Sequence, residues 1–186
     1  MGHIFIWTYE MNFLLCPAGQ KDVDFILSLI MNGARKGHFN SQAISDKGLM
    51  RSDLLSIIND GLDRNMLASV AYVAWNDGKR VGMASMTATT KPDGGFELGA
   101  IAVKPSDQNK GFGSLILETL LKEWLPKKNI YARCYPRSEK LFLMLQKRGF
   151  EFLGFSGEDR ILRHEKVSGI DLGLRLGAVI PTRHAS

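Results

Sequence analysis

Apolar side chains recur every three or four positions in several parts of the chain. Between positions 21 and 34, valine, isoleucine and leucine repeat at this spacing, as they do on the buried face of a helix. The same pattern predicts further helices over residues 49–59 and 138–148 and from about residue 113 to just before a proline at position 126. Gly61 and Gly149 are placed to end two of these helices, since glycine is common just past a helix C-terminus.

Short β-prone runs fill the spaces between the predicted helices. Two of them flank Asn-Asp-Gly-Lys at residues 76–79, a strong signal for a hairpin. Residues 98–103 are apolar at nearly every position, which is typical of a strand covered on both faces, so we expect this strand at the centre of the sheet. Other strands are predicted just before Pro17 and over residues 129–135, 150–155 and 160–167.

The predicted order is strand, helix, helix, three strands, helix, strand, helix and two strands. This order indicates an α/β fold in which a mixed sheet carries helices on both faces. The chain shows no internal repeat and no linker that would separate two domains, so we expect one domain. Residues 168–186 are rich in glycine and give no clear pattern.

The composition is that of an ordinary globular protein. A chain of 186 residues can bury one sizeable core, and 45% hydrophobic with 23% charged residues excludes a largely disordered protein. The two cysteines, Cys16 and Cys134, lie too far apart for a metal or redox motif and do not indicate a disulfide framework. We therefore expect no metal cofactor and a cytoplasmic location.

The ends and the charge of the chain argue against two other classes of protein. Polar residues interrupt the apolar runs of the first 19 residues and no basic segment precedes them, which disfavours a signal peptide. No stretch reaches the length of a membrane span. Without a signal peptide or a membrane span, we expect no membrane attachment. The net charge of +5 is compatible with an anionic ligand, with a nucleic acid, or with a role in solubility alone. Because the basic residues are scattered, we do not expect direct binding to nucleic acid.

The stretch Gln-Asn-Lys-Gly-Phe-Gly, residues 108–113, joins the central strand to the third helix. The first N–H groups of a helix have no carbonyl partner within it, and the helix dipole favours negative charge there. Gly111 and Gly113 carry no Cβ to block an approaching group, and Lys110 adds positive charge. The stretch predicts a site for phosphate or pyrophosphate. The glycines alone are equally compatible with a tight strand-to-helix turn.

Together with its flanking segments, this motif resembles the GCN5-related N-acetyltransferase (GNAT) family. The resemblance rests on Q-x-x-G-x-G at 108–113, on the strand "FELGAIAV" before it, and on "SEKLFLMLQKRGFEFLG" at 138–154, which is similar to the family's second conserved block. It implies an acyl-CoA N-acyltransferase fold with a mixed, mostly antiparallel central sheet. It also implies one domain over residues 11–168, with residues 1–10 as an N-terminal extension and 169–186 as a C-terminal tail.

The resemblance implies an N-acetyltransferase that moves an acetyl group from acetyl-CoA to a primary amine by direct attack in a ternary complex. The amides of residues 110–114 would hold the pyrophosphate of coenzyme A, and the main chain of Ile101 and Val103 would pair with the pantetheine arm. The N–H of Ile101 would stabilise the developing oxyanion. The cofactor-binding residues carried over in this way are Ile101, Ala102, Val103, Gln108, Asn109, Lys110, Gly111, Phe112, Gly113, Ser114 and Ser138.

The reaction needs a base, because an alkylammonium group must lose a proton before its nitrogen can attack. Glu97 matches the position of the family's glutamate base. We expect burial beside an apolar strand to raise the pKa of its carboxyl toward neutral pH. The alternative is a carboxylate at the rim that only binds the amine or pairs with a nearby lysine.

One departure concerns the proton for the leaving thiolate. Where the family often has a general-acid tyrosine, four residues before Gly149, this chain has Leu145, and Ser138 stands where a CoA-contacting asparagine is common. Thiols have pKa values near 8.5, so a thiolate can leave without full protonation and catalysis is weakened rather than excluded. Tyr135 is the substitute candidate for general acid, with simple packing as the alternative.

Three other residues have less specific signals. His38 and Phe39 fall where the family's acceptor site is usually lined, which makes His38 a substrate-side candidate or an ordinary exposed histidine. Cys134 lies on a predicted strand with no histidine nearby in sequence, so we expect it in the core and not as a nucleophile.

Two alternative functions stay open beside the enzyme. Leu145 is compatible with a catalytically weak acyl-CoA-binding module, and the positive charge is compatible with an acetyltransferase directed to RNA or the ribosome. The sequence does not identify the amine acceptor, because acceptor pockets are built from loops and helix faces. Members of the family are often dimers, which leaves a homodimer open as well.

Overall fold

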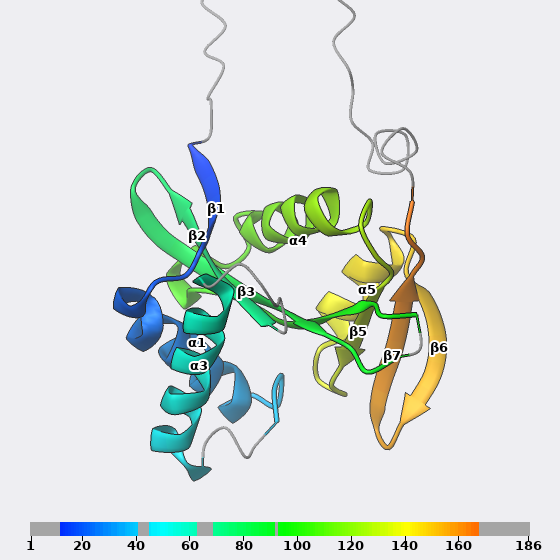
Figure 1. Cartoon of the computed structure of the whole chain (residues 1–186), viewed down its shortest axis with the longest axis horizontal. Coiled ribbons are helices and arrows are strands. Elements are labelled where there is room, and N and C mark those ends of the chain that lie inside the picture. Colours follow the sequence, from blue (N-terminus) through cyan, green and yellow to red (C-terminus); the bar gives the residue numbers. More distant parts are fainter. Residues whose placement is uncertain (1–11, 41–44, 63–68, 92, 168–186) are drawn as a thin grey trace, which may run out of the picture.

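The computed structural model describes residues 12–40, 45–62, 69–91 and 93–167. These residues form a seven-stranded sheet in the order β1-β2-β3-β4-β5-β7-β6, with helices on both of its faces (Figure 1). Every neighbouring pair is antiparallel except β4 and β5, which run parallel. The predicted fold class, a mixed and mostly antiparallel sheet flanked by helices, is confirmed.

The elements follow one another in the predicted order. The strands are Phe13–Pro17 (β1), Ser69–Asn76 (β2), Lys79–Ala88 (β3), Phe96–Val103 (β4), Ile130–Cys134 (β5), Glu151–Ser156 (β6) and Asp159–His164 (β7). The helices are Val23–Arg35 (α1), Lys47–Leu62 (α3), Phe112–Trp124 (α4) and Glu139–Gln146 (α5), with short 3-10 turns at Gln20–Asp22 (η1) and Pro105–Asp107 (η2).

The sequence signals at turns and helix ends are mostly confirmed. Asp77 and Gly78 have φ angles of 48° and 71°, as the two central residues of a tight β2–β3 hairpin require. Gly149 follows α5 with a φ of 86°, which glycine adopts without strain. Gly61 does not end α3, because the helix continues to Leu62.

Two hydrophobic clusters lie on opposite faces of the sheet. One packs α4 and α5 against the strands and includes Ile116, Leu120 and Leu162. The other packs α1 and α3 against the opposite face and includes Ile26 and Leu54. Burying one large aliphatic side chain contributes roughly 1.5–3 kcal/mol, so these two layers fix the helices on both sides of β4.

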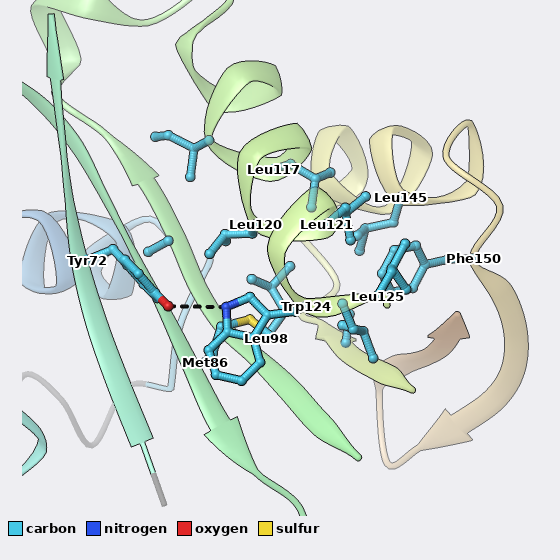
Figure 2. Packing of buried hydrophobic residues seen from close by; sticks show 14 of the residues in the cluster. Tyr72, Met86, Leu98, Leu117, Leu120, Leu121, Trp124, Leu125, Leu145 and Phe150 are labelled. Carbon is cyan, nitrogen blue, oxygen red and sulfur yellow. Dashed lines mark hydrogen bonds between the residues drawn. The ribbon is translucent and has the colours of Figure 1, made fainter. Parts of the chain in front are cut away.

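A buried polar pair ties α4 to the sheet. The indole N–H of Trp124 donates a hydrogen bond of 3.1 Å to the hydroxyl of Tyr72 on β2, within the packing of leucines shown in Figure 2. Burial, together with the charge of Glu123, raises the pKa of Tyr72 to about 12. The hydroxyl therefore stays protonated, and α4 is held in one position against β2.

The central strand β4 separates from its parallel neighbour halfway along. Phe96, Glu97 and Leu98 pair with residues 130–132 of β5, and no later residue of β4 does so. A register shift also leaves Gly99 outside the β3–β4 pairing, since Met86 faces Leu98 and Ser85 faces Ala100. The strand is central, as predicted, but the expectation that residues 98–103 are fully covered is wrong: only Leu98 is buried. Gly99 is exposed and residues 100–103 are half-buried, in the part of β4 that has no β5 partner.

Candidate active site

A cavity of about 460 Å³ lies beside the second half of β4. Its walls come from the end of α1 and the loop after it, from Ile101–Val103 on β4, from the junction between η2 and α4, and from α5 with the turn before it. These segments are far apart in sequence. All predicted cofactor-binding residues except Lys110 line this cavity.

The junction before α4 has the backbone geometry of a tight strand-to-helix turn. Gly111 is the N-cap of α4 with a φ of 88°, a conformation that strains any residue with a side chain. Gly113 differs, because a Cβ there would make only an ordinary contact of 3.8 Å with Val103. The first glycine is therefore needed for the turn, whereas the second leaves open space where the helix amides begin.

Side chains around this junction are tied to the protein. The Lys110 ammonium lies 2.8 Å from a carboxylate oxygen of Asp107, and this hydrogen bond lowers the pKa of Asp107. Lys140 on α5 donates a hydrogen bond of 2.8 Å to the amide oxygen of Asn109. Because the ion pair with Asp107 partly neutralises the charge of Lys110, this lysine attracts an anion less strongly than its sequence position indicates. The N–H groups and dipole of α4 remain the main attraction for an anion.

The end of β4 is held against this junction. The side-chain amide of Gln108 donates a hydrogen bond of 3.1 Å to the carbonyl oxygen of Val103. The hydroxyl of Ser114, in the first turn of α4, lies 3.5 Å from the sulfur of Met144 on α5. The strand end, the helix start and α5 thus form one connected wall of the cavity.

The loop after α1 forms another part of the cavity wall. Its His38 N–H donates a hydrogen bond of 2.9 Å to the carbonyl of Gly33, and the ring of Phe39 occupies the space where a Cβ on Gly33 would lie. The Nδ1 atom of His38 lies 3.3 Å from the hydroxyl of Ser138, at the start of α5. His38, Phe39 and Ser138 all line the cavity, so two distant parts of the sequence meet across it.

Glu97 does not line the cavity, and its environment differs from the expected one. Its side chain is 40% exposed and lies 3.9 Å from the Nε atom of Arg133 on β5. Arg133 also forms an ion pair of 3.3 Å with Asp159 at the start of β7. Glu97 therefore lacks the burial that the sequence led us to expect. Glu97 pairs with an arginine and not with the lysine of the alternative interpretation.

Cys134 is the last residue of β5 and is buried, whereas Tyr135, which follows it, is half-buried. Burial, and next the charge of Asp159, raises the pKa of Tyr135, so its hydroxyl keeps its proton. Tyr135 is not part of the cavity wall. Cys134 is fully buried, and burial raises the pKa of its thiol to about 11, which agrees with the expected core role.

The α5 residue at the family's tyrosine position faces the core. Leu145 has no exposed surface and packs in the cluster under α4, beside Leu121 in Figure 2. The face of α5 that meets the cavity carries other residues. Sequence reasoning missed these and several others that line the wall: Leu29, Asn32, Gly33, Lys36, Arg137, Lys140, Leu141 and Met144.

The described part of the chain contains no group of three or more His, Cys, Asp or Glu side chains placed to hold a metal ion. Within the same residues, no helix is long and apolar enough to cross a membrane.

Comparison with known proteins identifies the architecture. The family model described as an acetyltransferase (GNAT) domain matches residues 68–155, which include β2 to β4, α4, β5 and α5. No curated protein sequence matches the chain.

Solved structures share its fold at low sequence identity. The PaiA N-acetyltransferase from Thermoplasma acidophilum, in complex with coenzyme A, is 16% identical with a TM-score of 0.66, over 84% of this chain and 100% of that one. The spermidine N-acetyltransferase from Vibrio cholerae, in complex with CoA and spermine, is 17% identical with a TM-score of 0.62, over 81% and 92% of the two chains. FdhC, a nucleotide-linked sugar GNAT, is 12% identical with a TM-score of 0.70, over 90% and 94%.

Proposed function

Because residues 68–155 match the acetyltransferase (GNAT) domain and solved GNAT structures share the fold, we propose that the chain transfers an acetyl group from acetyl-CoA to a primary amine by direct attack in a ternary complex. The observation that carries this proposal is the cavity that connects the N-terminus of α4 with the open edge of β4. One elongated ligand fits such a cavity with its pyrophosphate at α4 and its thioester beside the strand. We assign the acetyltransferase domain to residues 11–168, with residues 1–10 and 169–186 outside it.

In this proposal coenzyme A is held mainly by backbone groups. The amides of residues 110–114 bind the pyrophosphate, where the helix dipole favours negative charge. Arg137, which lines the cavity, supplies a side-chain cation and takes the role that Lys110 cannot fill while it pairs with Asp107. The pantetheine arm lies along Ile101–Val103, where β4 has no β5 partner.

The acetyl transfer then needs a deprotonated amine and a stabilised oxyanion. Glu97, acting directly or through water, takes a proton from the acceptor ammonium and passes it to solvent. The N–H of Ile101 donates to the thioester oxygen as the nitrogen attacks the carbonyl carbon. Glu97 lies four residues before Ile101 on the same strand, on the β5-paired side of the separation point. The acceptor thus enters from the side of Glu97 and Arg133.

The acceptor class we propose is a primary alkylamine. Glu97 and Asp159 lie on either side of Arg133 and supply two carboxylates for a cationic substrate. Two of the three structures compared above are named for N-acetyltransferases, one of them a spermidine enzyme in complex with spermine. Their low identity makes the polyamines a starting point for a screen and not an assignment.

A second candidate function is an acyl-CoA-binding module with weak catalysis. Leu145 lies in the core and Tyr135 lies outside the cavity wall, so neither position offers the cavity a phenolic proton donor. This module would bind CoA as tightly as the enzyme does but would release acetate or amide slowly. Binding and turnover therefore have to be measured separately.

Calorimetric titration with CoA tests the cofactor site. We expect Gly113→Leu to lower CoA affinity at least about tenfold, because its side chain enters the space at the helix amides while its Cβ meets the protein only at ordinary contact distance. Lys122→Leu, at an exposed position of the same helix and outside the cavity wall, is the matched control and should bind CoA normally. Equal CoA affinities for the two variants would contradict a pyrophosphate site at the N-terminus of α4.

A further inference from the structure

We propose that His38 is the proton donor to the leaving thiolate of coenzyme A and that Ser138 positions its ring. This role is distinct from the two that the sequence left open, a substrate-side residue or an ordinary exposed histidine, and it rests on the proposed acetyl transfer.

The loop that carries His38 has a defined position. Its Lys36 and Gly37 N–H groups, as well as that of His38, bond to carbonyls at the end of α1. Gly37 has a φ of 74°, and a Cβ there would lie 2.9 Å from the side chain of Arg137. A residue other than glycine at position 37 is therefore strained, and the Arg137 side chain would have to shift to make room for it. Close packing against the turn before α5 places His38 at the cavity.

The partner of His38 is an unusual N-cap. Ser138 is the N-cap of α5, yet its hydroxyl makes no hydrogen bond to the helix backbone, which is the common use of a serine there. The hydroxyl instead lies 3.3 Å from Nδ1 of His38, and Ser138 is only 7% exposed. With Nδ1 engaged in this way, Nε2 is the nitrogen left to meet a ligand.

The other ionisable side chains of the cavity wall are poorer proton donors for a thiolate. They are Lys36, Asp107, Arg137 and Lys140. Guanidinium and ammonium groups ordinarily hold their protons well above neutral pH, and imidazole is the side chain that gives and regains a proton near pH 7. The Asp107 carboxylate accepts from Lys110, and the Lys140 ammonium donates to Asn109. His38 is thus the best suited donor among the described residues of the wall.

His38 gives up one proton and regains one within a single turnover. The amine nitrogen forms a bond to the thioester carbon, and the carbonyl electron pair moves onto oxygen. When that pair returns, the C–S bond breaks and its electrons stay on sulfur. Protonated His38 gives its Nε2 proton to this sulfur, so that coenzyme A leaves as the thiol. The neutral imidazole then takes the proton that the former amine nitrogen must lose to become an amide, and His38 is restored.

Histidine NMR with two ligands tests the contact without turnover. The probes are coenzyme A and desulfo-coenzyme A, which lacks the sulfur, added to protein labelled with ¹⁵N in histidine. We expect the His38 Nε2 resonance to shift with coenzyme A and to shift less with desulfo-coenzyme A. His164 is an internal control that should not move, because it is buried elsewhere and its Nδ1 bonds to the carbonyl of Glu165. Identical His38 spectra with both ligands would overturn the proposal, whereas no binding of either ligand would overturn the proposed function and this role together.

Kinetics distinguish proton donation from a structural role. We expect His38→Gln to lower kcat by about 100-fold, with KM for acetyl-CoA changed by less than about threefold. Added imidazole should restore part of the activity of His38→Ala, and Ser138→Ala should lower kcat by a smaller factor than His38→Ala does. An unchanged kcat in His38→Gln would rule out proton donation by His38. A rise in KM alone would show that His38 serves only to bind the ligand.

Discussion

The two ends of the proposed reaction site are built in different ways. At the cofactor end, consecutive residues at the start of α4 supply backbone N–H groups, and one glycine with a positive φ fixes the turn. At the acceptor end, Glu97, Arg133 and Asp159 come from β4, β5 and β7 and supply charged side chains. A backbone site depends on local sequence, whereas a side-chain site depends on how distant strands are placed. Binding at the cofactor end should therefore tolerate most side-chain substitutions near the start of α4. Function at the acceptor end should be sensitive to substitution of its charged side chains.

The largest difference between the two ends should appear at Glu97. We expect Glu97→Gln to lower kcat by roughly 100- to 10,000-fold, because the amide cannot take the acceptor proton, while CoA affinity stays unchanged. Parallel calorimetry and steady-state assays measure the two effects, with Glu151→Gln on the edge strand β6 as a control of equal charge change. Normal turnover in Glu97→Gln would remove Glu97 as the base.

Arg137 gives the converse test at the cofactor end. Charge-assisted hydrogen bonds contribute about 1.5–3 kcal/mol, so Arg137→Met should weaken CoA binding by roughly 10- to 100-fold while it keeps most of the aliphatic stem. The KM for the amine should not change. A change in amine KM with normal CoA affinity would place Arg137 at the acceptor end.

Arg133 should have a smaller effect with the opposite sign. Its ion pairs with Glu97 and Asp159 are partly exposed, and such pairs contribute about 0.2–1 kcal/mol. Arg133→Met removes a cation that competes with the substrate ammonium, so the KM for a primary amine should fall by roughly two- to fivefold. A rise in that KM would indicate that Arg133 itself binds the acceptor, through an anionic group.

Tyr135 should have the smallest effect. Its hydroxyl is protonated over the neutral range because burial raises its pKa, but it is not part of the cavity wall. We expect Tyr135→Phe to change kcat by less than about twofold and to leave the pH profile as it is. A fall in kcat of about 100-fold, as expected for His38→Gln, would indicate that Tyr135 is the general acid.

The same contrast between local and distant contacts explains what the sequence could predict. The element order, the hairpin at residues 76–79 and the glycine turn before α4 follow from local spacing and backbone chemistry, and the structure confirms them. The loss of coverage along β4 could not be predicted, because it depends on where β5 stops pairing. An apolar run indicates that a strand is central but not that a neighbouring strand diverges from it.

The candidate side chains show the same limit. No sequence signal placed the His38 side chain beside Ser138, since 100 residues separate them and only packing of the α1 loop against the turn before α5 joins them. Helical spacing on α5 could have indicated Leu141 and Met144, but it does not show which face meets a cavity. The partners of Glu97 and Lys110 likewise became known only from the positions of Arg133 and Asp107.

The most direct test of the central claim is the stoichiometry of acetyl transfer. Wild-type protein is incubated with acetyl-CoA and a panel of primary amines that includes polyamines and amino acids, and free thiol and amide product are both quantified. We predict one amide formed for each coenzyme A released with at least one amine, and at least about 100-fold slower amide formation with Glu97→Gln under the same conditions. Coenzyme A released only by hydrolysis, or amide formed equally by wild type and Glu97→Gln, would contradict the mechanism proposed here.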